Sequence, residues 1–324
     1  MENAQKTIVV LAGGFSSEHH ISVASGKTAF DAFVSAGFTT LLVILTKEGL
    51  FLEDRKVHLG ELNADYVFNC IHGTPGEDGH MSGFLKVLNL PHSTCDTFES
   101  ALTFSKSQCN QLLQLGGFTV PRGRLFHSYP GQEVFQEWKF PLFVKPNSSG
   151  SSFGVSKVDD SKQLEAAFEY ALSEGGSVLV EEGVLGTEVG CGVLSSTFDY
   201  STGMRLPKAT AQAIAITEIV PTEAGFFDYE AKYEGKSQEI TPARISEALT
   251  KKIEQVSTEV YQYLNLKGII RIDFIINTEG TPVLIEVNSI PGLSPASIVP
   301  QQLKHRGWSL STVLETMVHE ALAQ

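Results

Sequence analysis

The sequence contains few cysteines, and their spacing fits no metal or redox motif. Cys70, Cys95, Cys109 and Cys191 lie far apart and form no CxxC pair and no Cys/His cluster. A chain of 324 residues is large enough to fold around hydrophobic cores without disulfide bonds. We therefore expect reduced thiols and a cytoplasmic protein.

Long apolar runs are absent as well. No stretch approaches the length that crosses a membrane. The apolar run at residues 7–12 (TIVVLA) is too short for the core of a signal peptide, and it leads directly into Gly13 and Gly14. We interpret it as a first buried strand, and we expect no membrane partner.

Basic residues are fewer than acidic residues in this chain. The chain has 24 Lys and Arg against 37 Asp and Glu, a formal net charge of −13. So acidic a protein is poorly suited to bind nucleic acid or an anionic membrane. A negatively charged ligand would have to be bound by a few local cations together with backbone N–H groups.

Two common phosphate-binding motifs are missing. No GxxxxGK(S/T) loop occurs, and no GxGxxG follows the first strand. A weaker candidate is Lys145, which precedes a glycine- and serine-rich loop at 147–155 whose backbone N–H groups could surround phosphates. Lys106 and Lys232, taken alone, would be interpreted as solvated lysines.

The order of elements indicates an α/β part followed by α+β parts. Strands predicted at 7–12, 39–46 and 65–71 alternate with helices, which is typical of a doubly wound parallel sheet. A helix is predicted at 102–115, and a hairpin follows a helix at 246–264. We expect an N-terminal domain, a small central lobe and a C-terminal lobe, at residues 1–100, 101–182 and 183–324.

The predicted hairpin, GIIRIDFIINTEGTPVLIEVNSIPG, carries charges within apolar strands. A turn at Glu-Gly (279–280) places Asp273 opposite Glu286 and Arg271 opposite Asn288. Side chains alternate along a strand, so these four share one face. The other face is then covered by Ile272, Phe274, Ile276, Val283, Ile285 and Val287.

Opposed acids repel each other, so positive charge is needed between them. A hard divalent cation is the simplest source, because Asp273, Glu286 and the amide oxygen of Asn288 are hard ligands. They are too few for a full cage, which fits Mg²⁺ with phosphate and water as its other ligands. The alternative is that this face is solvated and its charges are ordinary surface residues.

Five segments of the chain carry motifs: GGFSSEHHIS (13–22), HGTPGEDG (72–79), VKPNSSGSSFGV (144–155), FFDYEAKY (226–233) and RIDF…EVNSIPGLSPAS (271–297). Together these segments resemble the D-alanine–D-alanine ligase family of ATP-grasp enzymes. The motifs occur in the family's order and cover nearly the whole chain. The glycine-serine loop of the third segment alone indicates only ATP-grasp, whereas the first and fourth segments point to this family.

The resemblance implies an ATP-grasp fold with a Rossmann-like N-terminal domain, and ATP between the central and C-terminal lobes. It implies that one D-alanine carboxylate takes the γ-phosphoryl group of ATP and becomes an acyl phosphate. The amine of a second D-alanine then attacks, phosphate leaves, and the dipeptide serves peptidoglycan synthesis.

The resemblance also implies ligands for metal and nucleotide. Two Mg²⁺ ions, which Mn²⁺ could replace, would be held by Asp273, Glu286 and Asn288. The residues that would contact ATP are Lys106, Lys145, Ser152, Glu181, Glu182, Glu188 and Lys232.

Three residues would serve the reacting centre by the same resemblance. Arg271 and the amide of Gly292, pre-set by Pro291, would stabilise the oxyanion of the tetrahedral intermediate. His72 matches a histidine close to that centre.

The two D-alanine molecules would bind at different segments. Glu18 would pair with the first ammonium and join Ser151 and Tyr233 in a link that closes a loop and excludes water. Ser297 and the amide of Ile298 would hold the second carboxylate.

Alternatives remain open at this point. Many family members have lysine where this chain has Glu182, so the charge beside the expected adenine site differs from the common pattern. The alternatives among enzymes are a D-alanyl-D-lactate or D-alanyl-D-serine ligase and another ATP-grasp carboxylate–amine ligase. By the resemblance, Tyr233 favours the dipeptide. A nucleotide-binding regulator would be expected to lack Arg271 or the metal-face acids. A homodimer is usual in the family.

Overall fold

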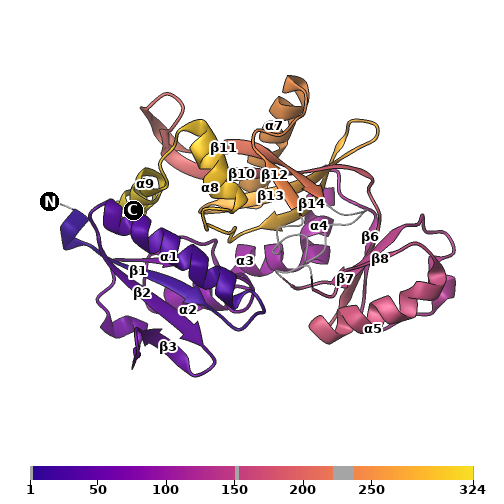
Figure 1. Ribbon diagram of the computed structural model, residues 1–324, viewed down its shortest axis with the longest axis horizontal. Coiled ribbons are helices and arrows are strands. Elements are labelled where there is room, and N and C mark those ends of the chain that lie inside the picture. The colour runs from indigo at the N-terminus through magenta and orange to yellow at the C-terminus, as the bar shows by residue number, and fades with distance from the viewer. Residues whose placement is uncertain (1–2, 150–152, 222–236, 324) are drawn as a thin grey trace.

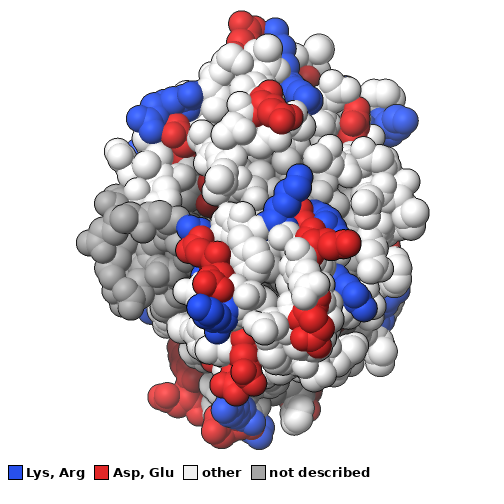
Figure 2. Space-filling view, turned by 90° about the vertical axis from the view of Figure 1, so that its right-hand side faces the viewer, with Lys and Arg blue, Asp and Glu red and all other residues white. Residues whose placement is uncertain are grey.

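The computed structural model describes residues 3–149, 153–221 and 237–323 and arranges them around three β-sheets. Figure 1 shows the N-terminal sheet at one end, the small sheet and its helix at the other, and the C-terminal sheet between them. Figure 2 looks at the end formed by the small sheet, where acidic and basic side chains are interspersed. No helix in the described part of the chain is long and apolar enough to span a bilayer.

The N-terminal sheet has the order β4-β3-β2-β1-β5. Its elements are β1 (Thr7–Gly13), α1 (His19–Ser35), β2 (Thr39–Thr46), β3 (Gly49–Leu52), β4 (Arg55–Lys56), β5 (Tyr66–Asn69) and α2 (His80–Val87). The predicted strands β1, β2 and β5 are parallel, as expected for buried apolar runs. The sheet is nevertheless mixed, because β3 and β4 add an antiparallel edge. The strand β3 is only four residues long and half-buried, and β4 has two exposed residues, so neither gives a strong strand signal in the sequence.

The small sheet is antiparallel with the order β6-β9-β7-β8. Its elements are β6 (Gly123–Phe126), β7 (Leu142–Pro146), β8 (Ser156–Val158), α5 (Leu164–Glu174) and β9 (Val178–Glu182). The helix α5 buries Phe168 against Phe126 and Phe135, with ring centroids 5.7 and 6.1 Å from the Phe168 ring. This lobe has the α+β architecture that the sequence predicts.

The C-terminal sheet has the order β12-β11-β10-β13-β14, with neighbouring strands antiparallel. Its elements are β10 (Gly186–Asp199), β11 (Met204–Pro221), β12 (Ser237–Ile240), α7 (Glu247–Tyr263), β13 (Ile270–Asn277), β14 (Pro282–Asn288) and α8 (Ile298–Arg306). Alternate residues of β10 enter different cores. Val193 packs in the core with α7, and Leu194 packs in the core with α8.

One hydrophobic core joins the two ends of the chain. The final helix α9 (Leu310–Leu322) packs against α1, and Phe33 of α1 shares a core with Val299 and Val313. The three sheets lie within the three predicted segments, but this core crosses the boundary predicted at residue 100. The exact domain boundaries stay a prediction.

The single helix predicted at 102–115 is wrong. The structure has two helices, α3 (Thr97–Phe104) and α4 (Lys106–Leu115), separated by Ser105 in an extended conformation. Asn147 holds the start of α4, because the Lys106 N–H donates to its carbonyl at 3.0 Å and the Ser107 N–H to its side-chain oxygen at 2.9 Å. The break therefore makes Lys106 the first residue of a helix.

The hairpin pairs its polar residues as predicted, but its loop is longer than predicted and β14 contains a bulge. Arg271 lies opposite Asn288 and Asp273 opposite Glu286. However, the Asn277 N–H donates to the Thr281 carbonyl, which leaves a three-residue loop instead of the predicted two-residue turn.

A bulge in β14 restores the predicted register. It changes the pairing between Asp273–Glu286 and Phe274–Leu284, so Ile285 is the extra residue. Leu284 therefore enters the core in place of the expected Ile285, which lines a cavity instead.

The conformation of the hairpin loop predicts that alanine substitutions at two glycines change the stability of the protein by different amounts. Gly280 has φ of +76° and Gly60 does not have a positive φ, while neither would bring a Cβ within 4 Å of another group. We expect Gly280→Ala to lower the free energy of unfolding by about 1 kcal/mol, because a left-handed residue strains a side chain. Gly60→Ala is the matched control with little change. Equal urea midpoints for the two variants would contradict the loop geometry.

Candidate active site

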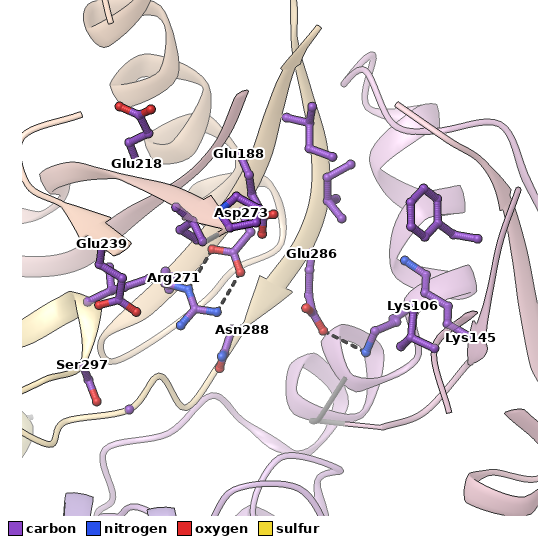
Figure 3. A pocket seen from close by; sticks show the side chains of 18 of the residues that line it. Lys106, Lys145, Glu188, Glu218, Glu239, Arg271, Asp273, Glu286, Asn288 and Ser297 are labelled. Atoms are coloured by element: carbon purple, nitrogen blue, oxygen red, sulfur yellow. Dashed lines mark hydrogen bonds and ion pairs between the residues drawn. The ribbon is translucent and has the colours of Figure 1, made fainter. Parts of the chain in front are cut away.

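A cavity of about 760 Å³ lies where the three sheets meet. Residues of α1, α4, the small sheet, β10 to β14 and the start of α8 line it. Figure 3 shows side chains from α4, the small sheet and the C-terminal sheet together with Ser297. The predicted site residues that line it are Glu18, His72, Lys106, Lys145, Glu181, Glu182, Glu188, Arg271, Asp273, Glu286, Asn288, Gly292, Ser297 and Ile298. Segments almost the whole length of the chain apart thus contribute to one space.

The opposed acids of the hairpin each have a cationic partner within the protein. The Arg271 guanidinium donates to both carboxylate oxygens of Asp273 at 2.7 Å, and Lys106 Nζ lies 2.8 Å from Glu286 Oε1 (Figure 3). A divalent cation, which the sequence made the simplest source of positive charge, is therefore not required to relieve their repulsion. Arg271 reaches Asp273 because residues two apart on a strand share a face.

These side chains still fit a hard cation that takes some of its ligands from the protein and others from a phosphate. Asp273, Glu286 and Asn288 offer carboxylate and amide oxygens, the ligands that Mg²⁺ prefers. The Asn288 side-chain oxygen accepts from the Ile290 N–H at 3.1 Å and keeps a second lone pair. Among the described residues, no three His, Cys, Asp or Glu form a metal cage. Asp273, Glu286 and Asn288 offer fewer ligands than Mg²⁺ takes, so water or phosphate would supply the others.

Lys106 is held between two lobes. Its Nζ donates to the Ser149 carbonyl at 2.6 Å as well as pairing with Glu286. Burial alone would lower the pKa of the Lys106 ammonium, but Glu286, and more weakly Glu77 and Glu181, raise the pKa above its ordinary value. Lys106 therefore stays charged at neutral pH.

A second buried ion pair lies on the small sheet. Lys145 Nζ is 2.6 Å from Glu181 Oε2, and Asn110 of α4 donates to Glu181 Oε1 at 2.8 Å. The Glu181 carboxylate thus already has two partners on its two oxygens. Glu188 lines the cavity from β10 (Figure 3). Sequence reasoning missed Asn110, which lies one helical turn from Lys106 on the same helix.

The unusual Glu182 is compensated by an arginine. Arg122 Nη1 lies 2.9 Å from Glu182 Oε1, and the Lys139 N–H donates to the same oxygen at 3.2 Å. The Arg122 guanidinium also lies 5.1 Å from the centre of the Trp138 ring. Arg122 and Trp138 were not predicted, and their sequence neighbourhood carries no motif that indicates the contact.

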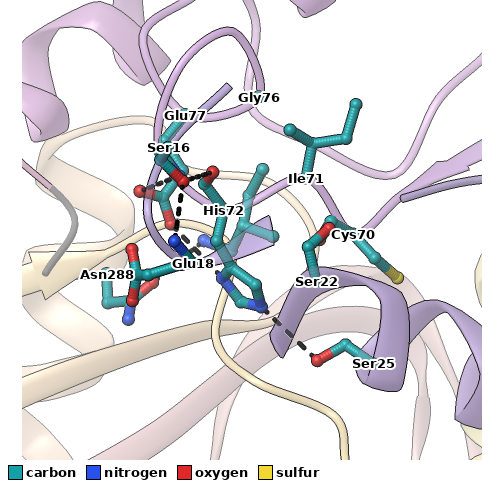
Figure 4. Close-up of polar contacts among 12 residues, drawn as sticks. Ser16, Glu18, Ser22, Ser25, Cys70, Ile71, His72, Gly76, Glu77 and Asn288 are labelled. Carbon is teal, nitrogen blue, oxygen red and sulfur yellow. Dashed lines mark hydrogen bonds and ion pairs between the residues drawn. The ribbon is translucent and has the colours of Figure 1, made fainter. Parts of the chain in front are cut away.

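On the N-terminal side, His72 is held between two buried side chains (Figure 4). Its Nε2 lies 3.4 Å from Ser25 Oγ, and its Nδ1 lies 3.8 Å from Glu77 Oε1. The Gly73 N–H donates to Glu77 Oε2 at 3.0 Å, which fixes the carboxylate. Ser25 and Glu77 were missed, although Glu77 lies in the same loop motif as His72.

Ser25 also anchors the loop after β14. The Leu293 N–H donates to Ser25 Oγ at 3.0 Å. The preceding Gly292 approaches Ser297 so closely that a Cβ at 292 would lie 2.8 Å from Ser297 Oγ. Ser297 precedes α8, so Gly292 and the first turn of α8 form adjacent parts of the cavity wall.

Four predicted residues lie outside the described part of the chain. They are Ser151, Ser152, Lys232 and Tyr233. Their roles in the loop closure and in phosphate binding stay predictions.

The ion pair between Lys106 and Glu286 predicts a change in amine reactivity. In Glu286→Gln the pKa of Lys106 should fall, because burial then acts without the nearest carboxylate. Acetic anhydride at about pH 9 should therefore acylate Lys106 faster than in the parent protein, since only the neutral amine reacts. Peptide mass spectrometry measures the rate relative to exposed Lys251, and Glu259→Gln on α7 is the control. Unchanged acylation of Lys106 would contradict the pairing.

Comparisons with known proteins agree on one family. A family model described as the C-terminus of D-Ala–D-Ala ligase matches residues 121–319. The curated D-alanine–D-alanine ligase of Porphyromonas gingivalis is 37% identical and that of Flavobacterium johnsoniae is 38% identical. The alignments cover 97% and 98% of this chain and 97% and 100% of those proteins, respectively.

Solved structures show the same architecture. D-alanyl-alanine synthetase A from Vibrio cholerae superposes with a TM-score of 0.84 at 28% identity, and VanG D-Ala:D-Ser ligase from Enterococcus faecalis with 0.84 at 29%. Each match covers 98% of this chain and 99% of the other. With its three sheets around one cavity and relatives aligned over nearly its whole length, the chain belongs to the D-alanine–D-alanine ligase family and has an ATP-grasp fold.

Proposed function

We propose that the protein joins two D-alanine molecules into D-alanyl-D-alanine, using ATP and releasing ADP and phosphate. The observation that carries the proposal is the cavity face on which Arg271, Asp273 and Glu286 lie beside Lys106 and the first turn of α8. The curated relatives support D-alanine as both donor and acceptor, so the D-lactate and D-serine alternatives are not favoured.

The cations of the cavity fit a triphosphate. Lys106 is the first residue of α4 and Lys145 lies in β7, and each is already paired with a carboxylate. When phosphate oxygens enter, these ammonium groups can exchange a carboxylate partner for a phosphate. Two Mg²⁺ ions held by Asp273, Glu286 and Asn288 would neutralise the charge of the transferred phosphoryl group, and Mn²⁺ could replace them.

Arg271 and the Gly292 amide are the proposed oxyanion donors. The guanidinium has donors beyond the two that bind Asp273, and the same pairing fixes its direction toward the cavity. An acyl phosphate carbon attacked by an amine develops charge on its carbonyl oxygen, which such prepositioned donors stabilise. His72, with Ser25 and Glu77 on either side, is the proposed neighbour of this centre.

The two amino-acid sites lie on different lobes. Glu18 at the start of α1 is proposed to bind the first ammonium, and Ser297 with the Ile298 amide the second carboxylate. An anion at the N-terminus of α8 would meet unpaired backbone N–H groups and the positive end of the helix dipole. Closure through Ser151 and Tyr233, phosphate contacts of Ser152 and Lys232, and a homodimer belong to the same proposal.

Ligation predicts a strict substrate pattern. With ATP and Mg²⁺, we expect ADP release with D-alanine alone and a product with the mass of the dipeptide. L-alanine should give no release, and added D-serine or D-lactate should not replace D-alanine as the main acceptor. ADP release without any dipeptide would contradict the proposal.

Asp273→Asn tests the same proposal at one residue. The amide keeps one acceptor for Arg271 but loses the charge at the metal face, so kcat should fall by about a hundredfold or more. The melting temperature should fall as well, because Arg271 loses one of its two acceptors, but the protein should still fold. Asp54→Asn, at an exposed residue between β3 and β4, is the matched control. Wild-type turnover in Asp273→Asn would refute the metal assignment.

A further inference from the structure

Gln302 is a fully buried amide that belongs to none of the sites described above. It lies in the middle of α8 and has 0% of its surface exposed. Its Nε2 donates to the Gly190 carbonyl at 2.9 Å and to Thr217 Oγ1 at 3.1 Å. Its Oε1 accepts from the Gly192 N–H at 3.0 Å. These contacts pair both ends of the side chain, so its position relative to β10 and β11 is fixed.

The stretch of β10 that Gln302 contacts lies directly beside the charged face of β13. Gly190 pairs with Asp273, and Gly192 pairs with Arg271. The side chain reaches this backbone because position 192 is glycine, since a Cβ there would lie 2.3 Å from Gln302 Oε1. Gln302 therefore binds to the strand that pairs directly with Arg271 and Asp273 in the sheet.

The N-terminal end of α8 forms part of the cavity wall. Ser297 and Ile298, about one turn before Gln302, line the cavity. Figure 3 shows Ser297 on the same side of the cavity as Arg271. Because a helix of nine residues behaves as a rigid rod, a tether at Gln302 also fixes its first turn.

Apolar packing alone would not fix α8 as firmly. Val299 and Leu303 bury the helix in the core, but apolar contacts tolerate small slides and rotations. A slide of α8 would leave the amide of Gln302 and two backbone groups of β10 buried without partners, which is strongly unfavourable. The glutamine thus selects one position of the helix.

We infer that Gln302 is a positioning residue for the second amino acid of the reaction. Gln302 ties α8 to Gly190 and Gly192. It thereby sets the distance between the proposed carboxylate site at Ser297 and Arg271, which is one of the proposed oxyanion donors. That distance decides whether the amine of the bound acceptor reaches the acyl phosphate. This inference rests on the proposed function.

Hydroxylamine separates the two halves of the reaction. Its nitrogen attacks the acyl carbon, the bond to the phosphate oxygen breaks, phosphate leaves and a proton passes to solvent, giving D-alanine hydroxamate. Hydroxylamine has no carboxylate, so it does not need the first turn of α8. The rate of hydroxamate formation thus depends on the binding of ATP, the first D-alanine and the metal. The rate of dipeptide formation depends on these and on the acceptor site as well.

Gln302→Met is the main variant, because it keeps the length of the side chain and removes all three hydrogen bonds. We expect the rate of dipeptide formation at saturating D-alanine to fall roughly tenfold or more, since small displacements of a bound reactant are costly in rate. The rate of hydroxamate formation should stay within about a factor of two. A parallel loss of both products, or no change in either, would overturn the inference.

Thr217→Val decides the question if Gln302→Met does not fold. Valine suits a strand, and the change removes only one partner of Gln302, so a smaller shift in the same direction is expected. Gln255→Met is the matched control, because Gln255 is an exposed residue of α7 that donates to Glu259 alone. If the parent protein forms neither hydroxamate nor dipeptide, the proposed function fails rather than the role of Gln302.

Discussion

Charge balance on the cavity face of the β13–β14 hairpin is the constraint on which the rest of the site depends. Two acids face each other across adjacent strands, and Arg271 and Lys106 compensate them from within the protein. The face is therefore neutral but made of four charges that can exchange partners. A metal–nucleotide complex brings both signs of charge at once, so it can take over the carboxylates and the cations together.

Several features of the fold serve to bring these charges together. The break at Ser105 places Lys106 at the start of α4, and Asn147 attaches that start to the small sheet. Lys106 therefore connects the central lobe to Glu286 of the C-terminal sheet. The shared core of α1 and α9 holds the N-terminal sheet against the same region.

The sequence predicted the facing pairs of the hairpin because side-chain alternation and a Gly-containing turn leave few registers. It could not predict the bulge at Ile285, since a two-residue and a three-residue loop fit the same residues. The pairing of Lys106 with Glu286 spans 180 positions, and no local pattern encodes such a contact. Gln302 was missed for the same reason, because its environment depends on glycines of a distant strand.

The most direct test of this account is Mn²⁺ binding followed by electron paramagnetic resonance, with and without a non-hydrolysable ATP analogue. Because Lys106 and Arg271 already compensate Glu286 and Asp273, the protein alone should bind Mn²⁺ only weakly. With the analogue present, two Mn²⁺ per chain should bind tightly, and Asp273→Asn should weaken that binding. Tight Mn²⁺ binding without nucleotide, or binding that does not depend on Asp273, would contradict the account.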